Sequence, residues 1–341
     1  MTTSASDEIA DRLLDSLINQ FSGRWHIEAD EGGLRMRPRT PLAGGKPLRH
    51  APHPRRVIDT MAQVFAAARV PRAAVLPIRW GRDTDLTMSA IQGLDPWLKD
   101  GADRVWREGF LPQPVVRFTG ERDDQGRLRD GYLTSFVNLS CTHRISGPEH
   151  HAALLGTWLD ALSAVGIHAG RVAIDGELAT WHRGPVSGIT LFLSCDGVGF
   201  ADAVLLWNTA DPSHMATDLG SGLERLCWLL SPQPWAHTVF GLAATWWDTD
   251  LLDAVRTATL LVMAGIRPGA HASGSALRRV LRRVPVPMAA AGLGRIIRAQ
   301  RAYWVDTGMS GPGWPHLADV IENEILTAAA RRSPQAKTTS P

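Results

Sequence analysis

The sequence predicts an α+β protein in which a mostly antiparallel sheet is flanked by helices and followed by an all-helical domain. Short strand-like segments separated by turn-rich stretches run from residue 113 to residue 207. Beyond residue 222, apolar residues recur at helical spacing almost to the end of the chain. The chain has 341 residues, which is enough for two domains of ordinary size.

The N-terminal segment, residues 1–56, is predicted to be a helix followed by a linker or hairpin. Residues 29–56 are rich in Gly, Pro and Arg without a repeating period, which is typical of such a connection. We divide the remainder into a first domain at 57–235, a helical domain at 236–325 and a flexible tail at 326–341. The first helix is marked by apolar residues at helical spacing: Ile9, Leu13, Leu14, Leu17, Ile18 and Phe21.

The first domain is expected to open with a helix at 57–68 and a short strand at 73–78. Strand-like segments follow, and the connection at 121–131 carries Asp-Gln-Gly and Asp-Gly, which are hairpin signals. An antiparallel sheet is the natural result. The expected strands are QPVVRFTG (113–120), GYLTSFVNLS (131–140), GRVAID (170–175), GITLFLSCD (188–196) and AVLLW (203–207).

Composition excludes several classes of protein. The formal net charge is +2, which is too near neutral to identify a partner, and the three cysteines do not suggest a disulfide framework. We therefore expect a reducing, cytoplasmic location. The longest apolar run, residues 257–266, is about half the roughly 20 residues that a membrane-spanning helix needs, so no membrane partner is expected.

Metal and nucleophile chemistry are not predicted. Cys141, His143, His150 and His151 lie close together, but their spacing is not that of a structural zinc site. The chain also lacks the Gly-x-Ser-x-Gly turn of a serine hydrolase.

The most informative stretch is residues 217–230, which read Thr-Asp-Leu-Gly-Ser-Gly-Leu-Glu-Arg-Leu-Cys-Trp-Leu-Leu. A helical apolar stripe starts at Leu223, so a helix is predicted to begin near Gly222. The glycines let a ligand approach the backbone, and the guanidinium of Arg225 suits a phosphate or a planar base. The same pattern is also typical of a plain core helix with a surface Glu and Arg, so the residues alone leave both interpretations open.

Residues 218–226, Asp-x-Gly-x-Gly-Leu-Glu-Arg-Leu, resemble motif 3 of the class II aminoacyl-tRNA synthetases in the form found in alanyl-tRNA synthetases. Two later segments, 253–265 and 276–283, resemble the helical domain with which those enzymes grip the tRNA acceptor stem. Other segments resemble the catalytic domain in the same order along the chain: LTMSAIQGLDPWL (86–98), QPVVRF (113–118), YLTSFVNLS (132–140) and GPVSGITLFLSCD (184–196).

The resemblance implies an enzyme that activates a small amino acid with ATP and Mg²⁺ and transfers it to tRNA. It implies that Arg117 bridges the substrate carboxylate and the α-phosphate, while Arg225 holds the γ-phosphate and stacks on adenine. These two arginines are the expected catalytic residues. The expected ATP-binding residues are Arg117, Phe118, Arg122, Gly222 and Arg225. The expected amino-acid-binding residues are Asn138, Asp202, Asp218, which takes the ammonium, and Gly220.

Three positions depart from the family pattern. Glu121 replaces a family lysine, Thr134 stands where an acidic residue is expected, and Leu191 replaces a glutamate. Such changes fit a pocket retuned for another amino acid. They equally fit a second hypothesis, a catalytically degenerate paralogue that acts as a tRNA- or protein-binding module.

The helical domain is strongly basic. Residues 254–301 contain nine arginines and no Asp, Glu or Lys, which gives +9 in 48 residues. Around 276–284 the arginines are expected on exposed faces, and a polyanion would relieve their mutual repulsion. The alternative is a solvated basic face. The expected tRNA-binding residues are Arg256, Arg278, Arg279, Arg282 and Arg283.

Overall fold

The computed structural model describes residues 5–30, 33–42 and 51–331, and the chain divides into two compact units. Unit 1 comprises Met1–Leu76, Ser89–Gln113 and Phe136–Pro234. Unit 2 comprises Pro77–Met88, Pro114–Ser135 and Trp235–Pro341. The predicted boundary lies at 235/236, and unit 2 resumes at Trp235. It was not predicted that two earlier segments, Pro77–Met88 and Pro114–Ser135, belong to the same unit as the C-terminal helices.

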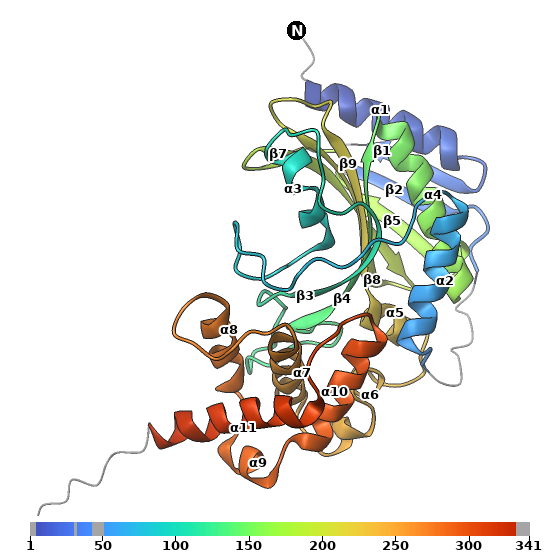
Figure 1. The fold of residues 1–341 in the computed structure, drawn as a ribbon. Helices are drawn as coiled ribbons and strands as arrows, with labels where there is room; N and C mark the ends of the chain where they lie inside the picture. The colour runs from blue at the N-terminus through green and yellow to red at the C-terminus, as the bar shows by residue number, and fades with distance from the viewer. Residues whose placement is uncertain (1–4, 31–32, 43–50, 332–341) are drawn as a thin grey trace, which may run out of the picture. The chain divides into compact units, whose positions relative to one another are not determined.

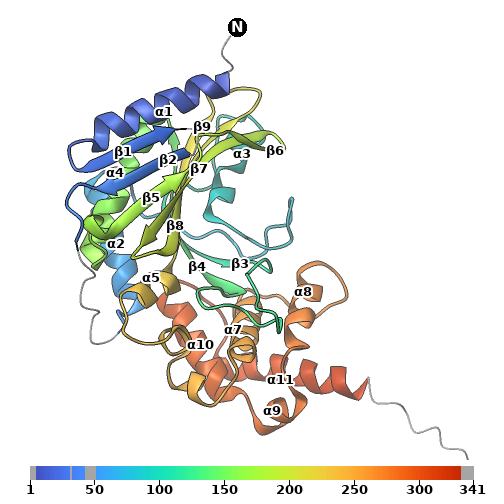
Figure 2. The ribbon, with the colours of Figure 1, turned by 180° about the vertical axis from the view of Figure 1, so that it is seen from behind.

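The α+β prediction is confirmed, because the described residues form a nine-stranded antiparallel sheet together with helices. The strand order is β1-β2-β5-β7-β8-β9-β4-β3, and β6 pairs with β7 (Figures 1 and 2). The strands are β1 (Trp25–Asp30), β2 (Gly33–Pro38), β3 (Gly109–Val116), β4 (Ser135–Ile145), β5 (Val172–Gly176), β6 (Trp181–Arg183), β7 (Val186–Cys195), β8 (Val198–Asn208) and β9 (Met215–Gly222).

The sheet of unit 1 has a different cover on each face. On one side, which we call the α4 face, α4 packs with α1 and α2, and Thr217 bonds to His151 of α4 (Figure 1). On the other, the α3 face, Ala216 packs against Leu94 and Leu98. The helical elements are α1 (Ala5–Phe21), α2 (Pro54–Ala67), η1 (Ala90–Leu94), α3 (Asp95–Leu98), α4 (Pro148–Val165), η2 (Ala169–Arg171) and α5 (Leu223–Leu229).

Unit 2 is built around helix α7, whose residues are buried from Leu251 to Met263. Helices α8, α10 and α11 pack against it, and α9 packs against α11 (Figure 1). The helical elements of this unit are α6 (Trp235–Phe240), η3 (Gly241–Thr245), α7 (Thr249–Met263), α8 (Ala272–Leu281), α9 (Val286–Ala291), α10 (Gly294–Asp306) and α11 (Trp314–Ala330).

The predicted N-terminal helix is present as α1, and the predicted hairpin is present as β1 and β2. The hairpin joins the sheet through β2–β5 pairing and buries Leu34 and Met36. One prediction in the next segment was wrong. Residues 73–78 are not a strand. The side-chain amide of Gln113 instead satisfies both backbone groups of Leu76, with its Oε1 2.6 Å from the amide nitrogen and its Nε2 3.2 Å from the carbonyl oxygen.

The C-terminal prediction was wrong in part. Helix α11 continues to Ala330, so the first residues of the predicted tail are helical. Residues 332–341, the rest of that prediction, lie outside the described part of the chain. No helix among the described residues is long and apolar enough to span a membrane.

Candidate functional site

The strand register of unit 1 aligns polar side chains in rows across the α3 face. The first row consists of Phe192 on β7, Asp202 on β8, Gly220 on β9 and Ser140 on β4, each directly opposite the next. Directly opposed residues of antiparallel strands project to the same face, so these side chains are neighbours. The second row, one step along the strands, is Thr190, Val204, Asp218 and Thr142.

Gly220 lies at the centre of these rows, with polar groups from two neighbouring strands converging over it. A Cβ placed on Gly220 would stand 3.0 Å from Oδ1 of Asp202, 3.4 Å from Nδ2 of Asn138 and 3.7 Å from Oγ of Ser140. The missing side chain therefore creates the space in which these groups meet. The hydroxyl of Ser140 also donates a hydrogen bond to Oδ1 of Asp218.

Asn138 is fixed by the backbone of the segment that covers this face. Its Oδ1 accepts hydrogen bonds from the amide of Ala90 at 3.2 Å and from the hydroxyl of Ser89 at 3.3 Å. This arrangement orients Nδ2 toward the space over Gly220, since the two ends of the amide point in different directions. The four predicted amino-acid-binding residues are thus brought together by β4, β8 and β9.

Helix α5 begins where β9 ends, with Gly222 as the residue before its first turn. Glu224 is buried and both its carboxylate oxygens lie 3.2 Å from the amide of Val137, so it is not the surface residue of the alternative interpretation. Arg225 is partly exposed, and its Nη1 donates to the carbonyl of Gly199 at 3.4 Å. Phe136, which is not among the predicted site residues, lies 3.8 Å from a Cβ built on Gly222.

Arg117 and Phe118 belong to unit 2, directly after the last residue of β3. The guanidinium of Arg117 donates through Nε to the carbonyl of Met88 at 2.5 Å, and its amide donates to the carbonyl of Thr134 at 2.8 Å. The ring of Phe118 lies under the guanidinium of Arg279, 3.8 Å from ring centre to Cζ.

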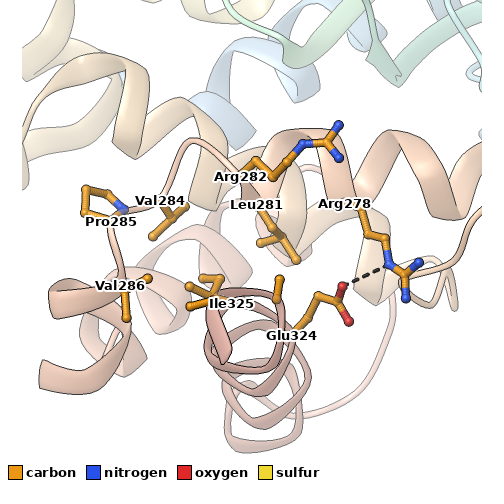
Figure 3. Close-up of a pocket in the computed structure, with 10 residues that line it drawn as sticks. Arg278, Leu281, Arg282, Val284, Pro285, Val286, Glu324 and Ile325 are labelled. Carbon is orange, nitrogen blue, oxygen red and sulfur yellow. Dashed lines mark hydrogen bonds and ion pairs between the residues drawn. The ribbon is translucent and has the colours of Figure 1, made fainter. Parts of the chain in front are cut away.

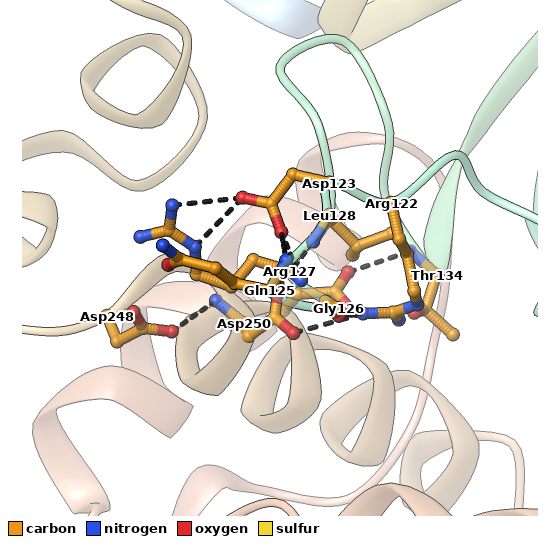
Figure 4. A network of polar contacts seen from close by, with 10 residues as sticks. Arg122, Asp123, Gln125, Gly126, Arg127, Leu128, Thr134, Asp248 and Asp250 are labelled. Atoms are coloured by element: carbon orange, nitrogen blue, oxygen red, sulfur yellow. Dashed lines mark hydrogen bonds and ion pairs between the residues drawn. The ribbon is translucent and has the colours of Figure 1, made fainter.

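Arg122 closes a polar network at the base of the hairpin in unit 2 (Figure 4). Its Nη1 lies 3.1 Å from Oδ2 of Asp250 and 2.6 Å from the carbonyl of Gly126. Oδ1 of Asp250 also accepts from the amide of Leu128 at 2.9 Å. The network ties the hairpin to helix α7, so Arg122 has a structural role beside its predicted contact with ATP.

The three departures from the family pattern have separate surroundings. Leu191 is fully buried on the α4 face, so a glutamate at its position would face the core rather than the rows. Thr134 is buried in unit 2, where its amide donates to Asp253 at 2.8 Å. Glu121 is on the surface and accepts from the hydroxyl of Tyr132 at 2.5 Å.

The prediction that Arg256 contacts tRNA was wrong, because its side chain is fully buried in unit 2. It donates to the carbonyl of Ser135 and to Gln300, and its guanidinium stacks against the rings of Tyr303 and Trp304. An arginine enclosed in this way has no route to a phosphate.

The arginines of α8 and its C-terminal turn have different surroundings. Arg279 and Arg282 are exposed, as predicted, whereas Nη1 of Arg283 is buried and has no hydrogen-bond partner among the described residues. Arg278 pairs with Glu324 of α11 at 2.9 Å, beside a groove of about 700 Å³ (Figure 3). Two of the five predicted tRNA-binding residues, Arg279 and Arg282, are therefore exposed.

The titratable groups near the sheet are governed by burial. Burial raises the pKa of the Cys227 thiol to about 12 and lowers the pKa of His151 to about 4. All three cysteines are free thiols and buried. Within residues 5–30, 33–42 and 51–331, no three His, Cys, Asp or Glu side chains are grouped as a metal ion would require.

No protein-family model matches the chain, and no curated protein matches it significantly.

Proposed function

We propose that the chain is an ATP-dependent ligase that activates an amino acid as its adenylate. The observation that carries the proposal is the convergence of Asn138, Asp202, Asp218 and Gly220 on one face of the sheet. The four were selected by resemblance to the amino-acid pocket of class II synthetases, and they lie on three strands that are separated in sequence. A second support is Arg225, which lies in the first turn of helix α5, directly after strand β9.

The site residues are suited to holding a zwitterionic substrate. A carboxylate such as Asp218 binds an ammonium through charge-assisted hydrogen bonds worth about 1.5–3 kcal/mol each. The substrate carboxylate would attack the α-phosphorus of ATP, forming an acyl–phosphate bond and releasing pyrophosphate. Because negative charge accumulates there, arginines are the appropriate partners, and Arg117 and Arg225 are assigned to it.

ATP would enter as its Mg²⁺ complex, with the metal carried by the phosphates as part of the substrate. Gly222 has no side chain to block the approach of the nucleotide, and Phe118 and Arg122 complete the proposed ATP-binding set. The adenylate would then react with a nucleophile of the acceptor, releasing AMP. A tRNA 3′ end is the acceptor that the resemblance implies, and another carrier is the alternative.

The test is amino-acid-dependent exchange of pyrophosphate into ATP, scanned over a panel of amino acids. We expect exchange with at least one amino acid, reduced about 100-fold or more in Arg225→Ala. The matched control is Arg104→Ala, which removes an exposed arginine of unit 1 and should leave the rate unchanged. Wild-type rates in Arg225→Ala would remove the catalytic role assigned to that residue.

A second candidate, an RNA- or protein-binding module without catalysis, is favoured by one observation. In unit 2 the predicted ATP residues already have internal partners, since Arg122 pairs with Asp250 and Phe118 stacks under Arg279. Exposed arginines such as Arg282 remain for a polyanion. Absence of exchange with every amino acid, combined with salt-dependent RNA binding, would establish this alternative over the first.

A further inference from the structure

Helix α7 carries polar side chains on one side, and these bind the connection between β3 and β4. The helix is buried from Leu251 to Met263, so most of these groups lie inside the protein. Their hydrogen-bond partners are groups of residues 128–135, which belong to the same unit. The side chains are those of Asp250, Asp253, Arg256 and Thr257. Helix α7 thus holds the connection that carries Arg117 and Arg122.

Asp253 is linked to the backbone of Arg117 through a single residue, Thr134. Oδ1 of Asp253 accepts a hydrogen bond from the amide of Thr134 at 2.8 Å. The carbonyl of Thr134 in turn accepts from the amide of Arg117, also at 2.8 Å. All three residues belong to unit 2. The position of the Arg117 backbone therefore depends on where Asp253 holds Thr134.

The acid at position 253 is not explained by packing. Asp253 is fully buried, and its Oδ2 has no hydrogen-bond partner among the described residues. Burial raises the pKa of Asp253, and hydrogen bonds from Thr134 oppose this rise more than the charges of Arg256 and Arg283 do. A carboxyl group is costly to bury, so an apolar side chain would suit a purely packed helix better. What the carboxyl group supplies is an acceptor for Thr134.

Removing that acceptor would displace Arg117. Thr134 is itself buried, so bulk water cannot replace the carboxyl group as the partner of its amide. A buried N–H without an acceptor is strongly unfavourable, so the backbone at Thr134 would shift to find another one. The amide of Arg117 is bonded to the same residue and would follow. The shift would also disturb the hydrogen bond from Nε of Arg117 to the carbonyl of Met88, which is 2.5 Å long.

We propose that Asp253 is a positioning residue for adenylate formation, which fixes Arg117 through the backbone of Thr134. This inference rests on the proposed function, because Arg117 is assigned there to the α-phosphate. Asp253 touches no substrate and acts only on the placement of a guanidinium. Helix α7 then serves the nucleotide chemistry, in place of the acceptor-stem contact that the resemblance of residues 253–265 implies.

The test compares three variants in pyrophosphate exchange and in amide hydrogen exchange followed by NMR. Asp253→Leu keeps the number of heavy side-chain atoms and removes the acceptor. Asp253→Asn keeps an acceptor oxygen in the same place. Thr259→Val is the matched control, because Thr259 is a buried polar residue of the same helix whose Oγ1 bonds within the helix, to the carbonyl of Val255 at 2.7 Å.

In Asp253→Leu we expect kcat to fall at least tenfold while KM rises less than threefold. The reason is that the negative charge that Arg117 neutralises develops in the transition state. The amide of Arg117 should exchange at least tenfold faster, whereas the amide of Leu128, which Asp250 holds, should not change. Asp253→Asn and Thr259→Val should stay within threefold of the wild type in both measurements.

The same change in an Arg117→Lys background separates positioning from a general loss of stability. With Arg117 already replaced, Asp253→Leu should lower the remaining rate less than twofold. A tenfold fall in both backgrounds would overturn the proposal. So would unchanged exchange of the Arg117 amide in Asp253→Leu. If Asp253→Leu does not fold, Asp253→Ala takes its place with the same expected results.

The outcomes also distinguish this proposal from the proposed function. If pyrophosphate exchange occurs but Asp253→Leu leaves it unchanged, the positioning role is overturned and the ligase stands. If no amino acid supports exchange in the wild type, the ligase is overturned and the Arg117 amide decides the rest. Faster exchange of that amide in Asp253→Leu, restored in Asp253→Asn, would then show that Asp253 positions Arg117, and equal exchange in both would overturn it.

Discussion

Replacing Arg256 by alanine tests the assignment of this arginine to the core of unit 2. Its Nε donates to the carbonyl of Ser135 at 3.0 Å, and its Nη1 donates to Oε1 of Gln300 at 3.2 Å. Its Cζ lies 4.0 Å from the ring centre of Tyr303 and 4.4 Å from that of Trp304. The substitution removes all four contacts and leaves two buried acceptors without a donor.

The expected cost follows from these contacts. Hydrogen bonds to a charged group contribute about 1.5–3 kcal/mol each, and a desolvated cation–π contact contributes about 2 kcal/mol. The sum is reduced because the variant no longer has to bury a charge, so a net loss of roughly 3–5 kcal/mol is expected. At about 2–4 °C per kcal/mol for a domain of this size, Tm should fall by roughly 6–20 °C.

The assay is thermal unfolding followed by circular dichroism, with Arg282→Ala as the matched control. Arg282 is exposed, so its removal should change the free energy of unfolding by no more than about 0.5 kcal/mol. RNA affinity, measured at a temperature at which both variants are folded, should be reduced more by Arg282→Ala than by Arg256→Ala. Equal Tm values for the two variants would refute the burial argument.

Three further predictions follow from the same geometry. Gly220→Ala should displace the Asp202 carboxylate, since the new Cβ would be 3.0 Å from it, and lower exchange about tenfold (~1.4 kcal/mol) without a comparable loss of Tm; unchanged exchange would contradict this. Burial lowers the pKa of His151 from 6.5 in the unfolded chain to about 4 in the folded protein. Below pH 6.5 the unfolded state therefore binds a proton that the folded state does not, and the free energy of unfolding falls by roughly 3 kcal/mol as the pH is lowered to 4. Denaturant titrations at pH 7 and pH 4.5 should show a smaller loss of the free energy of unfolding in His151→Asn than in the wild type. An equal loss in both proteins would exclude His151 as the cause. Arg279→Ala and Arg282→Ala should each reduce by about 1 the slope of the logarithm of RNA affinity against the logarithm of salt concentration. If neither substitution changes that slope, the RNA does not bind at these two arginines.

The strands with clear alternation were predictable, and β9 was not. β7 and β8 present apolar residues on the α4 face at every second position, which is the pattern from which strands are recognised. β9 is Met-Ala-Thr-Asp-Leu-Gly-Ser-Gly, whose glycines and aspartate disfavour a strand on propensity alone. Pairing with β8 on one side and β4 on the other overrides that propensity.

The basic residues show where sequence reasoning runs out. Composition does not distinguish an exposed arginine from a buried one. Helix α7 is apolar around most of its circumference, so its sequence has no separate polar and apolar faces from which the inward direction of Arg256 could be predicted. Its partners come from segments 121 and 44 residues away, which local spacing does not encode. The same limit applies to Phe192, whose side chain is exposed, because a phenylalanine in a strand ordinarily belongs to the core.

The candidate site and the core of unit 1 are set by one and the same register. Between the two polar rows, on the α4 face, lies a row of fully buried residues, Leu191, Ala203, Leu219 and Cys141, each opposite the next. A slip of one residue in any of these strands would expose an apolar side chain there and bury a polar one from the rows. Burial of that apolar row therefore fixes which side chains meet over Gly220. The departure at Leu191 follows from this, since a leucine there belongs to the packing that holds the rows in place.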